Sequence, residues 1–351
     1  MRLARMAPEI RRSLVQHSRL RRDPHATLRR LLDRVPPGTR PDEPVKDLET
    51  RVAALLGKPA ALFFPSGTMA QQVALRIHAD RTGRRTFAAH PTAHVALWEQ
   101  QGYNAVHHLV HRPVGDPHGL ITTEDLDGIG EPVSTLLLEL PQREIGGLLP
   151  EWDDLVTQTK WAAERGAATH VDGARLWEAQ PYYDRPHAEI AALFDTVYVS
   201  LYKGLEGVRG AILAGDQDTI DLAGVWRTRL GGNLPDLWPL AVAADLGLSE
   251  TLPRMPEFLA HARAIAAAVN ADGYARTVPD VPQTPLFHIH LPVPREAVRP
   301  AAERLLEETG IEVPRFPKSV APGTCALELT VGHLALDFTP EEVAELLRRL
   351  R

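Results

Sequence analysis

Three stretches of the sequence place reactive or ligand-binding side chains directly after apolar, strand-like runs. Lys203 follows "FDTVYVSLY", Asp172 follows "ATHV", and the triplet "SGT" at residues 66–68 follows "ALFFP". A lysine amine is strongly hydrated, and moving it into apolar surroundings costs free energy. Lys203 is therefore either a side chain that extends from a loop into water or an amine with a chemical task.

Each of these stretches alone has an ordinary explanation. A Ser-Gly-Thr triplet commonly caps a helix, and an Asp-Gly pair commonly forms a turn. Amides and hydroxyls at a helix N-terminus also bind phosphate, however, and α/β proteins bind ligands where their strands end. A phosphate site, a strand-end aspartate and a strand-end lysine together match what pyridoxal 5'-phosphate requires. We therefore expect Lys203 to bind this cofactor covalently, Asp172 to keep its ring nitrogen protonated, and the helix terminus to hold its phosphate.

The segments around these residues alternate between apolar strands and helical patterns. Strands are predicted within residues 60–67, 133–140, 167–173, 194–204 and 208–215, and helices within residues 44–57, 68–83, 150–166 and 174–180. Continuous apolar strands separated by helices are typical of a parallel or mostly parallel sheet that is covered on both faces. The sequence therefore predicts an α/β fold.

The pattern changes near Leu222, first to a helix-rich stretch and then to a smaller α+β part. We predict an N-terminal helical arm (1–40), a large cofactor-binding α/β domain (41–245) and a small C-terminal α+β domain (246–351). The arm is rich in arginine, so a transit peptide or a nucleic-acid-binding segment are alternatives. The helical spacing of "TLRRLLDRV" favours amphipathic helices that pack on the body or on another subunit.

Composition limits the classes of function. The 351 residues are 44% hydrophobic and 24% charged, and the net charge is −6, which gives no drive toward nucleic acid or anionic membranes. No apolar run approaches the length of a membrane span, and no "GxGxxG" follows a strand as in dinucleotide-binding proteins. The single cysteine, Cys325, excludes an internal disulfide and fits a reducing compartment. We expect a cytoplasmic protein with no nucleic-acid, membrane or metal partner.

The stretches "FFPSGTMAQQVALR", "HVDGARLW" and "SLYKGLEGVRGAILAG", in this order and spacing, resemble L-threonine aldolases of the β-eliminating lyase group. These are fold-type-I pyridoxal-phosphate enzymes, with a mostly parallel sheet in a large domain and a small α+β domain. The resemblance covers roughly half of the chain and more loosely the rest. It implies pyridoxal phosphate as cofactor and, because this fold binds it at a dimer interface, a homodimer or homotetramer.

The resemblance also implies residue roles. Lys203, His94 and Asp172 would be catalytic, with His94 stacking on the cofactor ring and assisting proton transfer. Cofactor-binding positions would be Ser66, Gly67, Thr68, His94, Asp172, Arg175, Lys203 and Arg229, with Arg227 a further cationic candidate. Substrate-binding positions would be Arg175, Glu99 and Gln142. Arg175 suits the substrate carboxylate because a guanidinium binds a carboxylate bidentately. Without the resemblance, His94 would be interpreted as a structural histidine.

Four departures from the family pattern affect the substrate side. A histidine that helps to remove the β-hydroxyl proton is replaced by Gln142, and an amide cannot act as a base. The N-terminal "RSDT"-like segment has no match, and a C-terminal arginine is missing where Glu328 and Leu329 stand. The Lys and Arg that flank a Gly triplet are Thr228 and Pro235. Either the substrate differs, or residues such as Arg143 or His333 take over these roles.

The predicted function is cleavage or formation of the Cα–Cβ bond of a β-hydroxy-α-amino acid, with L-threonine to glycine and acetaldehyde as the reference reaction. Another pyridoxal-phosphate lyase that performs β-elimination shares every residue named above and stays open as an alternative. A non-catalytic protein that keeps the fold for ligand sensing or assembly is the alternative from a different class.

Overall fold

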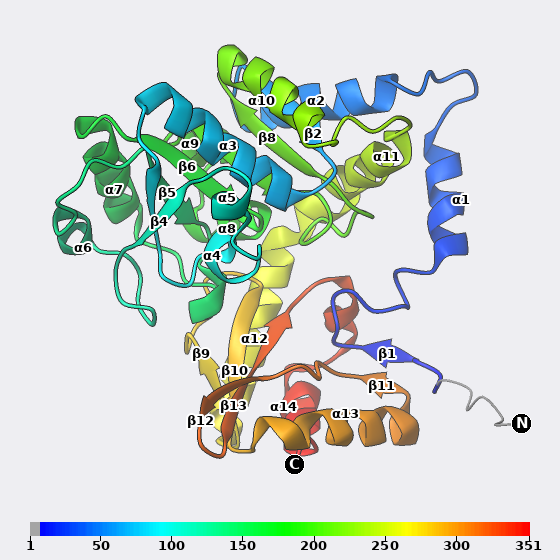
Figure 1. Cartoon of the computed structure of the whole chain (residues 1–351). Helices are drawn as coiled ribbons and strands as arrows, with labels where there is room; N and C mark the ends of the chain where they lie inside the picture. The colour runs from blue at the N-terminus through cyan, green and yellow to red at the C-terminus, as the bar shows by residue number, and fades with distance from the viewer. Residues whose placement is uncertain (1–7) are drawn as a thin grey trace, which may run out of the picture. The chain divides into compact units, whose positions relative to one another are not determined.

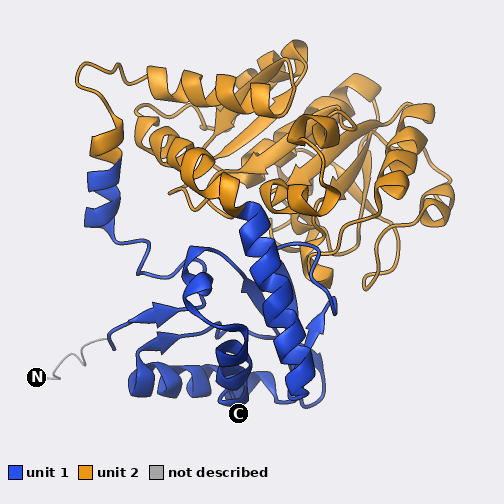
Figure 2. Cartoon of the chain, turned by 180° about the vertical axis from the view of Figure 1, so that it is seen from behind, with its two compact units in different colours: residues 1–30, 255–351 blue, residues 31–254 orange. Residues whose placement is uncertain are grey.

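The computed structural model describes residues 8–351, which divide into two compact units (Figure 2). The large unit is Leu31–Arg254, and the small unit combines residues 8–30 with Met255–Arg351. Each unit has its own sheet. The domain division 1–40, 41–245 and 246–351 stays a prediction.

A seven-stranded sheet forms the core of the large unit, in the order β2-β8-β7-β6-β5-β3-β4 (Figure 1). The strands are β2 (Ala60–Phe64), β3 (Thr86–Ala89), β4 (Val110–Pro113), β5 (Thr135–Glu139), β6 (Ala168–Gly173), β7 (Thr196–Ser200) and β8 (Ala211–Gly215). All neighbours pair in parallel except β8, which runs antiparallel to β2 and β7. The predicted α/β fold with a mostly parallel sheet is confirmed.

Helices connect these strands and pack on the sheet. They are α2 (Glu43–Leu55), α3 (Gly67–Thr82), α4 (His94–Leu97), α5 (Gly102–Ala105), α6 (Thr123–Asp127), α7 (Trp152–Glu164), α8 (Leu176–Tyr183), α9 (His187–Ala191), α10 (Gln217–Arg229) and α11 (Trp238–Leu246). Helix α3 contacts most strands of the sheet, from β2 to β3. Its apolar residues pack with Phe64, Tyr198 and Leu213 in one buried cluster.

Local sequence sets both ends of α3. Ser66 is the N-cap: its backbone is extended and its hydroxyl accepts a hydrogen bond from the Met69 amide at 3.3 Å, as expected for a serine in this position. Gly83 ends the helix in the left-handed conformation, with φ of 70°, which glycine adopts without a steric cost. Helix α3 therefore begins at the residues predicted to bind phosphate.

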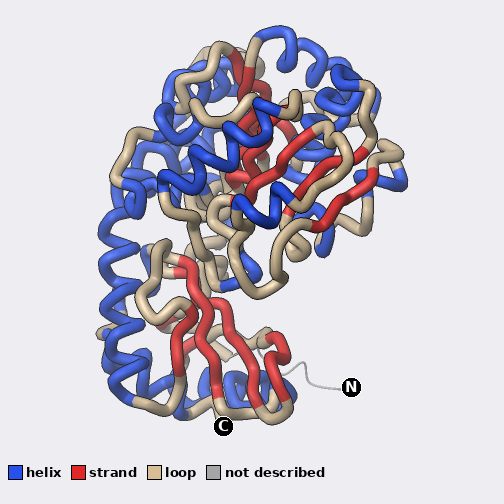
Figure 3. Tube along the Cα trace, turned by 90° about the vertical axis from the view of Figure 1, so that its left-hand side faces the viewer, coloured by secondary structure: helices blue, strands red, loops and turns tan. Residues whose placement is uncertain are grey.

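The small unit contains a four-stranded antiparallel sheet in the order β12-β13-β10-β9 (Figure 3). Its strands are β9 (Arg276–Val278), β10 (Leu286–Leu291), β12 (Lys318–Ala321) and β13 (Thr324–Thr330), and its helices are α12 (Met255–Asp272), α13 (Arg295–Thr309) and α14 (Pro340–Arg348). A short parallel pair joins β1 (Arg12–Ser13) to β11 (Ile311–Glu312). Helix α1 (Pro24–Arg34) corresponds to the helical spacing in "TLRRLLDRV".

Within residues 8–351, no helix is both long enough and apolar enough to cross a membrane.

Candidate active site

Three side chains lie in one row across the ends of β5, β6 and β7. Glu139 pairs with Asp172, and Asp172 pairs with Tyr198. Paired residues on neighbouring strands project to the same face of a sheet. Lys203 follows three residues after β7 ends at Ser200. The carboxyl ends of the parallel strands therefore bring two carboxylates, a phenol and the lysine-bearing loop together.

The N-terminus of α3 lies over this row. A Cβ on Gly67 would be 2.0 Å from the Tyr198 hydroxyl, so only glycine fits at that position. The amides of Gly67 and Thr68 belong to the first turn, where helix geometry provides no intrahelical acceptor. Thr68 is exposed, whereas Gly67 is buried. The helix terminus thus offers N–H donors next to the strand ends.

Lys203 and Asp172 are electrostatically linked. Asp172 is 1% exposed, and its Oδ1 accepts a hydrogen bond from the Ala174 amide at 3.0 Å. Burial lowers the pKa of the Lys203 amine, and the charge of Arg175 acts in the same direction, while Asp172 opposes both. Because the net shift is downward, a larger fraction of the amine is neutral than in an exposed lysine. A neutral amine is the nucleophilic form.

His94 is held by a buried carboxylate. Its Nδ1 lies 3.2 Å from Glu99 Oε1, and the Glu99 side chain has no exposed surface. Burial on its own lowers the pKa of His94, but the hydrogen bond to Glu99 and the charge of Asp172 outweigh it, and the net pKa is raised. Lys203 also acts on His94 through its charge. The imidazole therefore belongs to the same electrostatic cluster as Asp172 and Lys203.

Glu139 is held by two backbone amides. Its carboxylate accepts hydrogen bonds from the His94 amide at 3.0 Å and from the Arg143 amide at 3.2 Å. Burial, together with the charge of Asp172, raises the pKa of Glu139 to about 7. The carboxyl group therefore titrates near neutral pH, in contact with the segment that carries His94.

Arg175 forms an ion pair within the same region. Its Nη1 donates to both carboxylate oxygens of Glu178, at 2.8 and 2.9 Å, and both side chains are buried. A Cβ on Gly204 would lie 2.6 Å from Glu178 Oε1. Glu178 therefore contacts the residue next to Lys203 as well as Arg175. Breaking a buried pair by removing one partner leaves an uncompensated charge, which is strongly destabilising.

The remaining predicted residues lie in different surroundings. Gln142 is buried, and its side-chain amide nitrogen lies 3.3 Å from the Thr92 hydroxyl. It stands three residues after Glu139 in the sequence. Arg229 is exposed and its guanidinium lies 4.8 Å from the centre of the Trp226 ring. None of its described contacts involves another predicted site residue. Arg227 donates to the Phe63 carbonyl at 2.6 Å, so it supports the strand that leads into the phosphate-binding triplet.

Sequence reasoning did not select Tyr198, Glu178, Gln71 or Gln72 as site residues. Tyr198 stands in an apolar strand and Glu178 on a helix, so neither position is distinctive in the sequence. Gln71 and Gln72 lie one turn after Gly67 and contact Glu99 (Gln71 Nε2 to Oε1, 3.4 Å; Gln72 Nε2 to Oε2, 2.9 Å). Their position one helical turn from the phosphate triplet is the signal that could have found them.

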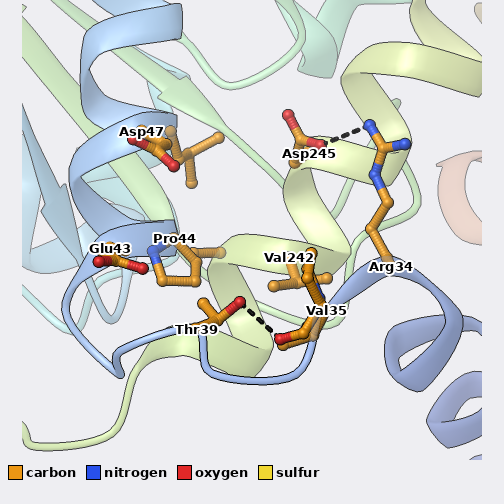
Figure 4. A pocket seen from close by; sticks show the side chains of 11 residues that line it. Arg34, Val35, Thr39, Glu43, Pro44, Asp47, Val242 and Asp245 are labelled. Atoms are coloured by element: carbon orange, nitrogen blue, oxygen red, sulfur yellow. Dashed lines mark hydrogen bonds and ion pairs between the residues drawn. The ribbon is translucent and has the colours of Figure 1, made fainter.

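A pocket of about 300 Å³ lies elsewhere in the large unit, between residues 34–48 and α11 (Figure 4). Arg34 donates to Asp245 at 3.0 Å, and the Thr39 hydroxyl donates to the Pro36 carbonyl at 2.8 Å. Glu43 also lines the pocket. It contains none of the residues predicted for catalysis or cofactor binding.

The residues at the strand ends fit pyridoxal phosphate. The donor set has a desolvated amine, a buried carboxylate for a protonated ring nitrogen, and a capped helix terminus for a phosphate. The Oε1 atom of Gln71 is buried and has no hydrogen-bond partner among the described residues. Such an orphaned buried acceptor is expected where a ligand completes a site.

Comparison with known proteins supports the same family. The family model of the beta-eliminating lyases matches residues 39–291. The low-specificity L-threonine aldolase 1 of Arabidopsis thaliana is 28% identical over 285 residues, which cover 77% of this chain and 78% of the relative.

Two solved structures are similar along almost the entire chain. A candidate L-allo-threonine aldolase from Listeria monocytogenes has a TM-score of 0.90 and 36% identity, covering 97% of this chain and 96% of its own. A candidate aromatic amino acid beta-eliminating lyase/threonine aldolase from Exiguobacterium has the same TM-score and identity, covering 97% of each chain. The predicted fold-type-I architecture is confirmed, and the chain belongs to the beta-eliminating lyase family.

Proposed function

We propose that this protein is a pyridoxal-phosphate-dependent aldehyde-lyase. It cleaves or forms the Cα–Cβ bond of a β-hydroxy-α-amino acid, with L-threonine to glycine and acetaldehyde as the reference reaction. The observation that carries the proposal is that Asp172 at the end of β6 and Lys203 after β7 interact electrostatically with each other and with His94, the first residue of α4. The threonine aldolase names of the relatives support the reaction class.

Residues at the strand ends and at α3 would hold the cofactor. Lys203 would bind it covalently, Asp172 would pair with its ring nitrogen, and Ser66, Gly67 and Thr68 would bind its phosphate. The bound cofactor supplies an electron sink for the carbanion that remains when the Cα–Cβ bond breaks. Asp172 suits its role because it is buried, and a buried carboxylate interacts strongly with a cation beside it. Arg229 is proposed as a further phosphate contact.

His94 is the group that we propose to move a proton at the substrate. With Nδ1 held by Glu99, the Nε2 atom is the ring nitrogen that remains for exchange. Glu99 and Asp172 raise its pKa against the effect of burial, so the protonated ring is favoured more than in a histidine that is buried without such partners. We propose that Gln142 binds the substrate by its amide and does not act as a base.

Arg175 is proposed to bind the substrate carboxylate and to contribute to the cofactor site. Its Nη1 is occupied by Glu178, which fixes the plane of the guanidinium. A planar guanidinium in a fixed orientation offers a carboxylate two parallel donors. Glu99, also predicted to bind substrate, would act there through His94, because its described contacts are with His94 and the two α3 glutamines.

The remaining parts of the proposal concern assembly and location. By resemblance we propose a homodimer or homotetramer in the cytoplasm, with a small-molecule amino acid as partner. The division into an arm (1–40), a cofactor-binding domain (41–245) and a C-terminal domain (246–351) is proposed on the same basis.

The test is an aldehyde assay on protein loaded with pyridoxal phosphate. L-threonine, L-allo-threonine and phenylserine are supplied separately, and release of aldehyde is followed. Lys203→Ala should reduce the rate by at least about a thousandfold, since it removes the nucleophile, and should abolish the visible absorbance of the bound cofactor. Lys160→Ala, at an exposed position of α7, is the matched control and should leave both unchanged.

Absence of aldehyde from all three substrates would overturn the aldolase assignment. Release of pyruvate or ammonia in its place would assign a β-elimination. Cofactor absorbance without any turnover would indicate a non-catalytic protein.

A further inference from the structure

The carboxylate of Glu99 is enclosed by N–H donors from two elements. His94 Nδ1 lies 3.2 Å from Oε1, Gln71 Nε2 lies 3.4 Å from the same oxygen, and Gln72 Nε2 lies 2.9 Å from Oε2. The side chains of Glu99, Gln71 and Gln72 are almost fully buried. A buried carboxylate is stable as an anion only when such donors surround it.

Each of the two glutamines contacts a different oxygen of the Glu99 carboxylate. Gln72 makes the shortest contact and is the one described donor to Oε2. With Oε2 bound, the carboxylate plane is fixed and Oε1 faces the imidazole. Because an ionised carboxylate only accepts hydrogen bonds, the His94 atom that faces it must be protonated. The orientation of the Glu99 carboxylate, to which Gln72 contributes, is therefore linked to the position of the hydrogen on His94.

The backbone after Glu99 is shaped around Gln72. Gln100 and Gln101 both have positive φ, 50° and 55°, a conformation that is unfavourable for residues with a Cβ. A Cβ on Gly102 would lie 2.5 Å from Nε2 and 2.8 Å from Oε1 of Gln72. This tight turn presents Glu99 to α3, and its glycine leaves space for the Gln72 amide. Strained backbone of this kind is typical of functional sites.

We propose that Gln72 is a positioning residue: it fixes Glu99 so that His94 carries its proton on Nδ1 and keeps Nε2 for the reacting side of the site. Gln71 assists by its weaker contact to Oε1. The consequence for catalysis rests on the proposed function, in which His94 Nε2 moves a proton. The effect on the imidazole itself does not depend on it.

The charged groups that act on His94 are Glu99, Asp172 and Lys203, together with Glu139, whose carboxylate accepts from the His94 backbone amide and interacts with the charge of the ring. Asp172 favours the protonated ring and Lys203 disfavours it, but both act through their charge and neither accepts a hydrogen bond from Nδ1 among the described contacts. Only the Glu99 carboxylate distinguishes the two ring nitrogens in this way. Loosening Glu99 should therefore change the tautomer more than the charge state.

The experiment uses the full chain without added cofactor, labelled with 15N-histidine. The ring-nitrogen signals of His94 are identified by their absence in His94→Gln, and the tautomer is read above the pKa of His94. The original protein should hold one tautomer, with hydrogen on Nδ1. Gln72→Leu should populate both tautomers. Glu99→Gln should do so more completely and should also lower the pKa of His94.

Gly102→Ala provides a second variant if Gln72→Leu folds poorly. The three atoms nearest to the added methyl group all belong to the flexible end of Gln72, so it should displace the amide and reproduce the mixed tautomers. Gln158→Leu is the matched control, because Gln158 is a buried glutamine that donates instead to the Ile121 carbonyl at 2.7 Å. It should leave the His94 signals unchanged although it also loses a buried hydrogen bond.

A single Nδ1–H tautomer in both Gln72→Leu and Gly102→Ala would overturn the proposal, as would an equal change in Gln158→Leu. In loaded enzyme that cleaves threonine, Gln72→Leu should lower kcat by about tenfold and leave KM within about twofold. Because the tautomer is read without cofactor or substrate, failure of the aldolase assignment would leave this readout intact, and failure of the readout would leave the aldolase assignment intact.

Discussion

Two histidine networks contact α3, and the histidines in them have pKa values that are shifted in opposite directions. Toward the C-terminal half of α3, the Thr196 hydroxyl lies 2.8 Å from His78 Nε2 and 2.8 Å from His170 Nδ1, and burial lowers the pKa of the two histidines to about 4 and about 3. At the N-terminal end, His94 faces Glu99, and its pKa is raised although burial opposes this.

Burial on its own lowers the pKa of all three histidines. Among the described residues, the more deeply buried His78 and His170 differ from His94 above all in having no carboxylate as hydrogen-bond partner. A hydroxyl is neutral and can both donate and accept, so it binds uncharged histidines on either side. A carboxylate stabilises the imidazolium form against desolvation. Helix α3 thus contacts a polar network whose histidines are neutral near pH 7 and, about two turns away between His78 and Gln72, a network whose histidine is more readily charged. The neutral network supports the fold, and the chargeable one is suited to proton transfer.

The largest effect that separates the two networks is expected for Thr196→Val. Valine keeps the shape of threonine and its preference for a strand, but it leaves the facing nitrogens of His78 and His170 without their partner. Each unsatisfied buried group costs about 1–3 kcal/mol, so loss of both contacts should lower the free energy of unfolding by about 2–6 kcal/mol. Urea unfolding measures this loss, while the pKa of His94 should stay unchanged.

Thr157→Val is the control for Thr196→Val. Thr157 is on α7, and its hydroxyl donates to the Asp153 carbonyl in an exposed position. It should lose less than about 0.5 kcal/mol. An equally small loss in Thr196→Val would contradict the idea that the hydroxyl holds this network together.

The next effect is the pH dependence of stability, which has opposite signs in the two networks. Burial raises the pKa of Glu139 to about 7. The contribution of this shift to the free energy of unfolding is fully present below the unfolded-state pKa near 4.5, and it is lost as pH rises through 7. The lowered pKa values of His78 and His170 mean that their contribution is present above 6.5 and is lost as pH falls through 4 and 3.

Glu139→Gln should therefore become more stable relative to the original protein as pH rises from 5 to 8. The expected relative gain is on the order of 2 kcal/mol, measured by urea unfolding of cofactor-free protein at both pH values. Glu164→Gln, at an exposed position of α7, should show no such change. An equal difference between variant and original protein at pH 5 and pH 8 would refute the raised pKa.

The sequence predicted the fold and the chemistry of the strand ends because both have local signals. Apolar runs located β2, β5, β6 and β7, and Asp172 and Lys203 stand at or after the ends of two of them. The antiparallel direction of β8 had no such signal, since an apolar run reads the same in both directions. The pairing of Glu139, Asp172 and Tyr198 depends on the register between strands, which single-sequence patterns do not determine.

Local sequence patterns also did not predict the surroundings of individual side chains. Gln71 and Gln72 read as ordinary helical residues until α3 and the segment after α4 are brought together. The prediction that Glu99 binds substrate came from sequence position, whereas the burial of its side chain against His94 has no local signal. Arg227 and Arg229 are two residues apart in sequence, yet one donates to the Phe63 carbonyl and the other lies exposed over Trp226. Such differences arise from tertiary packing.

The smallest expected effect concerns the charge of Asp172 in the chargeable network. Asp172→Asn keeps a carbonyl oxygen that can accept from the Ala174 amide and removes only the negative charge. Since Asp172 raises the pKa of His94 through its charge, whereas Glu99 also does so through a hydrogen bond, the pKa should fall by about one pH unit or less, and by less than in Glu99→Gln. The pH titration of 15N-labelled, cofactor-free protein measures the shift.

The signals of His78 and His170 should not move, because their pKa values are set by burial and not by Asp172. An unchanged or raised His94 pKa would show that the charge of Asp172 does not raise it, and the raised pKa of His94 would then depend on Glu99.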